Sequence, residues 1–103
     1  MDHNAIKNGD ALELSLNGKF TFADNKVFAN IFDQIAGRSF KRVVIDLSGV
    51  EFIDSAALGI LLLARDKCEK SETALTLKNP KGQVKQMFDI SRFNDLFKIE
   101  TAA

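Results

Sequence analysis

The chain has 103 residues, with fourteen basic and fourteen acidic side chains, so its formal net charge is zero. This length suits one compact core and is too short for two. Neutrality provides no long-range attraction to nucleic acid, and the apolar run Ala56 to Ala64 is far shorter than the roughly 18 residues that span a bilayer. We therefore expect one domain over residues 1–103 that binds no nucleic acid and does not insert into a membrane.

The N-terminus and the cysteine content indicate the compartment. Met1 to Asn4 have neither the basic start nor the apolar core of a secretory signal. Cys68 is the only cysteine, so the chain cannot form an internal disulfide or supply a cysteine cluster for a metal. We expect a cytoplasmic protein that contains no metal and no cofactor.

The first third of the chain predicts a hairpin followed by a helix. Leu12, Leu14 and Leu16 alternate with polar residues, which is the pattern of a strand with one covered face. The turn sequence at residues 8–10 predicts a first strand around residues 4–7, antiparallel to it. Asp24 is a candidate cap for a helix through Ala36, and Gly37 is a fitting terminator. Apolar residues recur at helical spacing at Val27, Phe28, Ile31 and Ile35.

The middle of the chain predicts a buried strand, a turn and a second helix. The β-branched run at residues 43–45 is typical of a strand that is covered on both faces, as in a parallel sheet. Asp46 marks the expected end of that strand, and the pair Ser48-Gly49 is typical of a turn. Either Asp54 or Ser55 is expected to cap the helix that follows.

The remaining third continues the alternation of strands and helices. Residues 73–78 are rich in strand-forming side chains, and residues 97–100 predict a last strand. Between them, Asn79-Pro80 predicts a cap and a first helical residue, leading into a helix that carries Val84, Met87 and Phe88. The whole pattern predicts an α/β domain whose sheet is mixed but mostly parallel, with helices packed on it.

Three segments resemble the signature of the STAS domain, the fold of anti-sigma factor antagonists, and a weaker similarity extends over about the whole chain. They are Asp46-Leu47-Ser48-Gly49-Val50, Phe52-Ile53-Asp54-Ser55 and Leu58-Gly59. The resemblance implies a STAS fold in which Ser55 is the site of regulatory phosphorylation by a partner kinase. Members of the family usually have another helix after the last strand. Because the sequence stops at Ala103, we expect that helix to be absent here. An apolar face, available to a second copy or a partner, would then lie at Phe93, Leu96, Phe97 and Ile99.

A phosphate on Ser55 would add about −1.5 to −2 charge at a helix N-terminus, where free N–H groups and the helix dipole favour an anion. The simpler alternative is that Asp54 and Ser55 are only a capping pair. The expected neighbours of the site are Asp54, Asp46, Thr21 and Asp24. Thr21 stands where the family often has an aspartate, and Asp24 is either a nearby carboxylate or a helix cap. Asp46 either positions the loop or stabilises a turn.

Small residues at the start of the helix leave room for another protein beside Ser55. The expected partner-binding residues are Ala56, Ala57, Gly59 and Leu63, although ordinary core packing is the simpler explanation for this helix. A dianionic phosphate in such a contact would weaken binding through desolvation and like-charge repulsion.

Nothing in the sequence favours an enzyme. The only histidine, His3, lies in the N-terminal segment, and neither a glycine-rich phosphate loop nor metal-ligand spacing occurs. The STAS resemblance instead implies a bacterial partner-switching regulator. Its unphosphorylated form would bind an anti-sigma factor or a serine kinase of the histidine-kinase-like ATPase type, and a PP2C-type phosphatase would reverse the phosphorylation. The alternative is a constitutive STAS subunit of a lipid-type ABC transporter complex, without a phosphate switch.

Overall fold

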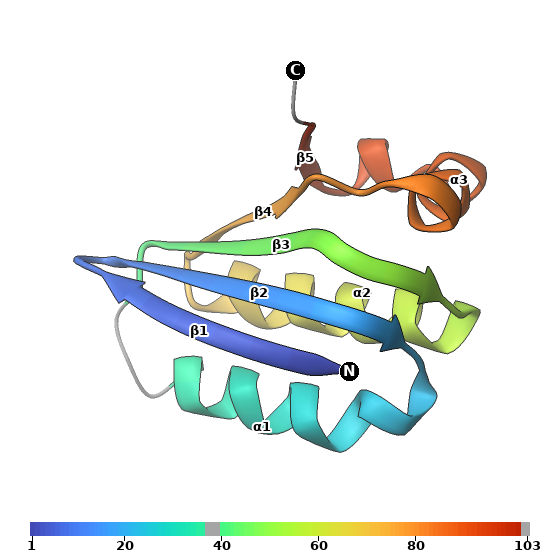
Figure 1. Cartoon of the computed structure of the whole chain (residues 1–103). Coiled ribbons are helices and arrows are strands. Elements are labelled where there is room, and N and C mark those ends of the chain that lie inside the picture. The colour runs from blue at the N-terminus through green and yellow to red at the C-terminus, as the bar shows by residue number, and fades with distance from the viewer. Residues whose placement is uncertain (37–39, 102–103) are drawn as a thin grey trace.

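The protein folds as five strands in one sheet with three helices, as seen in a computed structural model that describes residues 1–36 and 40–101, without the side chains of 34–36 (Figure 1). The strands are β1 (Asp2–Asn8), β2 (Ala11–Phe20), β3 (Arg42–Ile53), β4 (Ala74–Lys78) and β5 (Lys98–Glu100). The helices are α1 (Asn25–Ala36), α2 (Ser55–Lys70) and α3 (Gly82–Ile90), with short 3-10 turns η1 (Phe22–Asp24) and η2 (Phe93–Asp95). None of these helices is long and apolar enough to cross a membrane.

The sheet has the order β1-β2-β3-β4-β5, in which β1 is antiparallel to β2 and all other neighbours are parallel. The hairpin is closed by Asn8 opposite Ala11, with Gly9 in the left-handed region at φ +64°. This arrangement confirms the predicted α/β fold, its mixed but mostly parallel sheet and its N-terminal hairpin.

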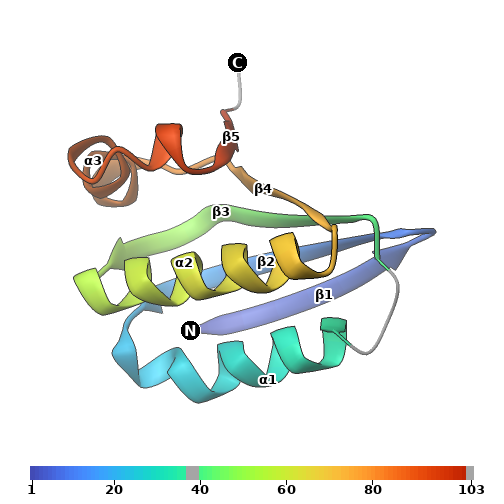
Figure 2. The same cartoon turned by 180° about the vertical axis from the view of Figure 1, so that it is seen from behind.

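Helices α1 and α2 lie side by side on the same face of the sheet (Figure 2). The alternating leucines of β2 are all buried under them, as the period of two predicted. Phe20, Phe28 and Phe32 stack in series in this layer, with ring centroids 5.2 Å and 5.0 Å apart. The core therefore fixes the position of α2, and with it Ser55, relative to β2 and β3.

Strand β3 is longer than its sequence suggests. It continues through Asp46 and Ser48-Gly49 to Ile53, so the predicted strand end and turn are wrong. The register between β2 and β3 shifts after the pair Ser15–Asp46, and this irregularity accommodates the polar residues and the glycine within the strand. Only one face of β3 is fully buried in its first part, because Val43 and Ile45 are buried whereas Val44 is half-buried.

One helix cap and one helix start differ from the predictions. The helix α1 begins at Asn25, directly after Asp24 as predicted, but the Asp24 carboxylate accepts from the backbone N–H of Thr21 and belongs to the preceding turn η1, which is capped by Thr21. The helix α3 begins at Gly82 rather than at Pro80, because Lys81 has an extended backbone at φ −135° and ψ 158° and is the N-cap of the helix. Gly37, the expected terminator of α1, lies outside the described residues.

The C-terminal part buries most of the apolar face that the sequence predicted to be uncovered. Phe93 and Phe97 are buried, since Phe88, Phe93 and Phe97 form a second stack with both centroid distances at 4.9 Å. Ile99 is partly buried against the core, and only Leu96 remains exposed, at 41%. That predicted face is therefore reduced to Leu96, and the absence of the family's final helix stays a prediction.

Candidate functional site

Ser55 is the first residue of α2 and follows directly on the end of β3. Its cap is Asp54, whose Oδ1 accepts a hydrogen bond of 2.8 Å from the backbone N–H of Ala57. Ser55 itself is exposed, and its hydroxyl makes no hydrogen bond to any described residue. Asp54 therefore provides the side-chain cap of α2, and within the described part of the chain the Ser55 hydroxyl takes part in no hydrogen bond that holds the fold.

The second oxygen of Asp54 reaches another part of the chain. Asp54 Oδ2 accepts a hydrogen bond of 3.2 Å from the backbone N–H of Phe22, in the connection between β2 and α1. The backbone N–H of Asp54 also donates to the carbonyl of Phe20 at 3.3 Å. The turn that presents Ser55 is thus joined by one hydrogen bond to the last residue of β2 and by one to the β2–α1 connection.

Thr21 and Asp24 lie in that connection and form a capping box around η1. Thr21 Oγ1 accepts from the backbone N–H of Ala23 at 3.3 Å, and Asp24 Oδ2 accepts from the backbone N–H of Thr21 at 2.9 Å. Asp24 is buried and also pairs with the α-amino group of Met1 at 3.3 Å. Both predicted neighbours therefore belong to the segment that Asp54 contacts, where they hold the backbone of η1.

Asp46 is not a neighbour of Ser55, so this part of the predicted site is wrong. It pairs with Ser15 on β2 and Lys78 on β4, seven residues before the end of β3, which places it roughly 20 Å away at the usual rise of a strand. Its carboxylate accepts a 3.0 Å hydrogen bond from the backbone N–H of Ser48. Asp46 therefore stabilises the irregular part of β3 and cannot position the Ser55 turn directly.

The predicted partner-binding residues separate into two groups. Ala57 is fully buried in the core, because it lies on the face of α2 that packs on the sheet, so its assignment as a contact residue is wrong. Ala56 is half-buried, Gly59 is exposed, and Leu63 is 60% exposed. Ser55, Gly59 and Leu63 follow one another at intervals of four residues, so they form a single stripe along α2.

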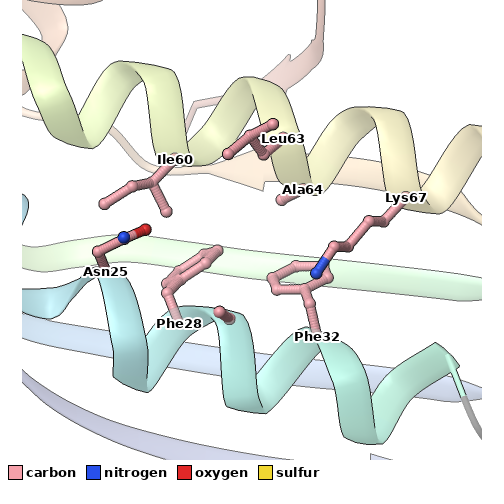
Figure 3. Close-up of a pocket in the computed structure, with 8 residues that line it drawn as sticks. Asn25, Phe28, Phe32, Ile60, Leu63, Ala64 and Lys67 are labelled. Atoms are coloured by element: carbon pink, nitrogen blue, oxygen red, sulfur yellow. The ribbon is translucent and has the colours of Figure 1, made fainter.

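A groove between α1 and α2 adjoins this stripe (Figure 3). Its lining is mostly apolar and comprises Asn25, Phe28, Ala29, Phe32, Ile60, Leu63, Ala64 and Lys67. Lys67 Nζ approaches Asp33 Oδ1 at 3.2 Å near one end. The free space is about 80 Å³. Ligand pockets usually measure about 300 to 1,000 Å³, so the groove is too small for a nucleotide or a drug-sized molecule.

Two residues that were not predicted from the sequence also shape this site. Phe22 is 67% exposed beside the Asp54 carboxylate, although phenylalanine in this sequence generally indicated core. Gln83, in the first turn of α3, hydrogen-bonds to the backbone of Ile53 through both atoms of its amide. No local sequence pattern marks either contact, because both involve backbone groups about 30 residues away.

Comparison with known proteins decides the family. Residues 3–102 match the STAS domain. The chain belongs to the STAS domain family. A STAS-domain containing protein of Pseudomonas aeruginosa (strain UCBPP-PA14) is 34% identical over 91 residues, which cover 88% of this chain and 89% of that protein. BtrV of Bordetella bronchiseptica, a candidate anti-sigma factor antagonist, is 34% identical over 59 residues, which cover 57% of this chain and 51% of BtrV.

A solved structure shows the same fold for this STAS domain. A candidate anti-sigma factor antagonist from Thermotoga maritima superposes with a TM-score of 0.88 at 21% sequence identity, covering 97% of this chain and 86% of that one. The likeness extends over the sheet and the helices together, so the position of Ser55 at the junction of β3 and α2 belongs to a fold that both proteins share.

Proposed function

We propose that this STAS domain is a reversible protein-binding regulator of the anti-sigma factor antagonist kind, switched by phosphorylation of Ser55. The observation that carries the proposal is the exposed Ser55 hydroxyl, which has no hydrogen-bond partner among the described residues and stands at the start of a helix capped by its neighbour Asp54. A serine with no structural task at this position is free to be modified.

The geometry is compatible with phosphate on Ser55 without unfolding. The backbone N–H groups of Ser55 and Ala56 have no hydrogen-bond partner among the described residues, because the cap from Asp54 engages Ala57. A phosphate there would accept hydrogen bonds from these groups and interact favourably with the positive end of the helix dipole. The modification is therefore expected to change the surface while leaving the fold intact.

The same phosphate would oppose binding of a partner. Ser55, Gly59 and Leu63 form one stripe on α2, so a protein that covers Gly59 and Leu63 also approaches Ser55. The unmodified stripe carries no charged side chain, whereas a phosphate adds about two negative charges next to the Asp54 carboxylate. Burying that charge against a partner costs desolvation and like-charge repulsion. Phosphorylation therefore releases the partner.

The partners proposed for this cycle are an anti-sigma factor or a serine kinase of the histidine-kinase-like ATPase type, and a PP2C-type phosphatase. These proposals derive from the STAS resemblance around Ser55 and from the anti-sigma factor antagonist naming of BtrV. The binding surface consists of Ala56, Gly59 and Leu63, with the adjoining groove able to accept one aliphatic side chain.

A pull-down with Ser55→Ala and Ser55→Asp tests the proposal. Wild type and Ser55→Ala should capture the same partner from the native cell extract, and Ser55→Asp should capture at least tenfold less. Ser71→Asp is the matched control, because it places the same charge at the opposite end of α2. Equal capture by all four proteins would contradict the switch and would favour a constitutive transporter subunit, especially if the captured protein is an ATPase.

A further inference from the structure

Gln83 makes a two-point contact with the last residue of β3. Its Oε1 accepts a hydrogen bond from the backbone N–H of Ile53, and its Nε2 donates to the carbonyl oxygen of Ile53, both at 2.9 Å. A primary amide has one acceptor and two donors in a plane, so it satisfies a backbone residue in the way a neighbouring strand would. Gln83 thus supplies the two hydrogen bonds that a neighbouring strand would make to Ile53.

The contact is needed because β4 does not extend this far. β4 pairs with β3 only from Arg42 to Asp46, so the later part of β3 has no strand neighbour on that side. The helix α3 packs there instead, beside the C-terminal end of β3 (Figure 1). Without Gln83, the polar backbone groups of Ile53 would lose their protein partner, at a point that is partly shielded from water.

Ile53 and Asp54 are held from opposite sides. Gln83 binds Ile53 from the side of α3, and the carbonyl of Phe20 accepts from the N–H of Asp54 on the side of β2. The next residue is Ser55. The backbone is therefore fixed on both sides immediately before the residue whose hydroxyl is exposed.

We infer that Gln83 is the positioning residue of the Ser55 turn: its amide fixes the end of β3 and thereby sets how readily Ser55 is recognised by a modifying enzyme. The phosphorylation part of this inference rests on the proposed function. Positioning a reacting group is a large component of reactivity, and displacement by about 1 Å can reduce a rate by about 100-fold. The side-chain hydrogen bonds of Gln83 within the described residues go to the backbone of Ile53 and not to Ser55, so Gln83 acts through the backbone.

Two substitutions at Gln83 separate its hydrogen bonds from its bulk. Gln83→Met keeps the length of the side chain and removes both bonds, whereas Gln83→Glu at neutral pH keeps an acceptor for the Ile53 N–H and loses the donor to the Ile53 carbonyl. Gln86→Met is the matched control, since Gln86 is an exposed glutamine of the same helix and makes no side-chain hydrogen bond to any described residue.

The first measurement is amide hydrogen exchange by NMR on the full chain. Gln83→Met should reduce the protection of the Ile53 and Asp54 amides at least tenfold, Gln83→Glu should retain part of the Ile53 protection, and Gln86→Met should match wild type. Unchanged protection in Gln83→Met would overturn the inference, as would an equal loss of protection throughout the sheet.

The second measurement is the fraction of Ser55 that carries phosphate in the native cell, determined by mass spectrometry. Gln83→Met should lower this fraction at least fivefold relative to wild type and Gln86→Met. Val84→Ala, which removes buried volume from the same helix, controls for a loss of stability alone. If Val84→Ala lowers the phosphorylated fraction of Ser55 equally, the effect of Gln83 arises from stability alone, and its proposed effect on Ser55 is overturned. A wild type that never carries phosphate would overturn the proposed function, while hydrogen exchange would still decide whether Gln83 fixes the turn.

Discussion

The carboxylate of Asp54 accepts a hydrogen bond from the backbone N–H of Phe22, 32 residues earlier in the chain, at 3.2 Å. Its other oxygen caps α2 through the N–H of Ala57 at 2.8 Å. One side chain therefore connects the helix that begins at Ser55 with the connection between β2 and α1. Loss of this carboxylate removes two hydrogen bonds at once.

Replacing Asp54 with alanine should lower the free energy of unfolding by about 1 to 2 kcal/mol, the usual cost of losing a helix N-cap. Asp54→Asn should cost less, because the amide oxygen still accepts one hydrogen bond. Urea unfolding followed by circular dichroism measures both. Asp66→Ala on the exposed face of α2 is the control and should stay near wild type. If Asp54→Ala and Asp66→Ala are equally stable, the bonds of Asp54 contribute nothing.

Gly49 should not tolerate a larger residue, although it lies in an extended strand. A Cβ atom there would overlap the side chain of Asn17 and approach the carbonyl oxygen of Leu16 at 3.0 Å. The contact lies where the register of β2 and β3 shifts. Gly49→Ala should therefore destabilise the domain by about 1 to 3 kcal/mol, as overpacking usually does. Urea unfolding measures this cost.

A second-site change tests whether Asn17 causes that cost. Asn17→Ala should recover part of the stability that Gly49→Ala loses, so the two changes should be non-additive. Gly59→Ala is the matched control, because Gly59 lies within α2 and an added methyl group would meet open space there. This control change should stabilise the helix by about 0.5 to 1 kcal/mol. A Gly49→Ala protein as stable as wild type would contradict the close contact.

The sequence was sufficient to predict the elements that are marked by a local periodicity or turn sequence. The alternating leucines of β2 and the hairpin before it are patterns within a few residues, and both lie where the sequence predicts. The full length of strand β3 is not predictable locally, because Asp46, Ser48 and Gly49 are residues typical of a strand end and a turn. Their place in a strand depends on the shifted pairing with β2, which is a property of two segments about 30 residues apart.

The same distinction applies to the candidate site. Asp54, Ser55 and the start of α2 are consecutive residues, so capping chemistry sufficed to predict them. The contributions of Phe22 and Gln83 depend on backbone groups that every residue carries, and nothing in the sequence specifies which of those groups a distant segment will meet. Asp46 cannot position the Ser55 loop directly, because β3 continues for seven residues beyond it.

Cys68 should be unreactive in the folded protein at neutral pH. Burial raises the pKa of its thiol from 9.0 to about 11, because the thiolate loses its hydration. The thiolate fraction at pH 8 is therefore about 100-fold below that of a free cysteine, and accessibility is low as well. Labelling with a thiol reagent such as Ellman's reagent should require unfolding. Stoichiometric labelling of native protein within seconds would contradict this prediction.

The same pKa shift makes stability depend on pH. Between about pH 9 and 11 the unfolded state loses the Cys68 proton while the folded state retains it, so the free energy of unfolding falls as the pH rises. Below about pH 9 the Cys68 thiol is protonated in both states, so the stabilising contribution of the buried thiol to the free energy of unfolding is fully present. Cys68→Ala should remove this part of the alkaline decline even though it starts from a lower stability. Identical slopes for the two proteins between pH 9 and 11 would show that Cys68 does not titrate as predicted.

Two leucines of α2 should separate folding from binding. Leu61 is fully buried, so Leu61→Ala should cost about 2 to 5 kcal/mol of unfolding free energy. Leu63 is 60% exposed at the edge of the α1–α2 groove, so Leu63→Ala should change stability by less than about 0.5 kcal/mol. If the Ser55 stripe is the partner surface, Leu63→Ala should nevertheless reduce partner capture about tenfold, as loss of a central apolar contact does. Capture at the wild-type level by a fully folded Leu63→Ala protein would place the partner on another face, because Leu63 supplies most of the exposed apolar surface of this stripe.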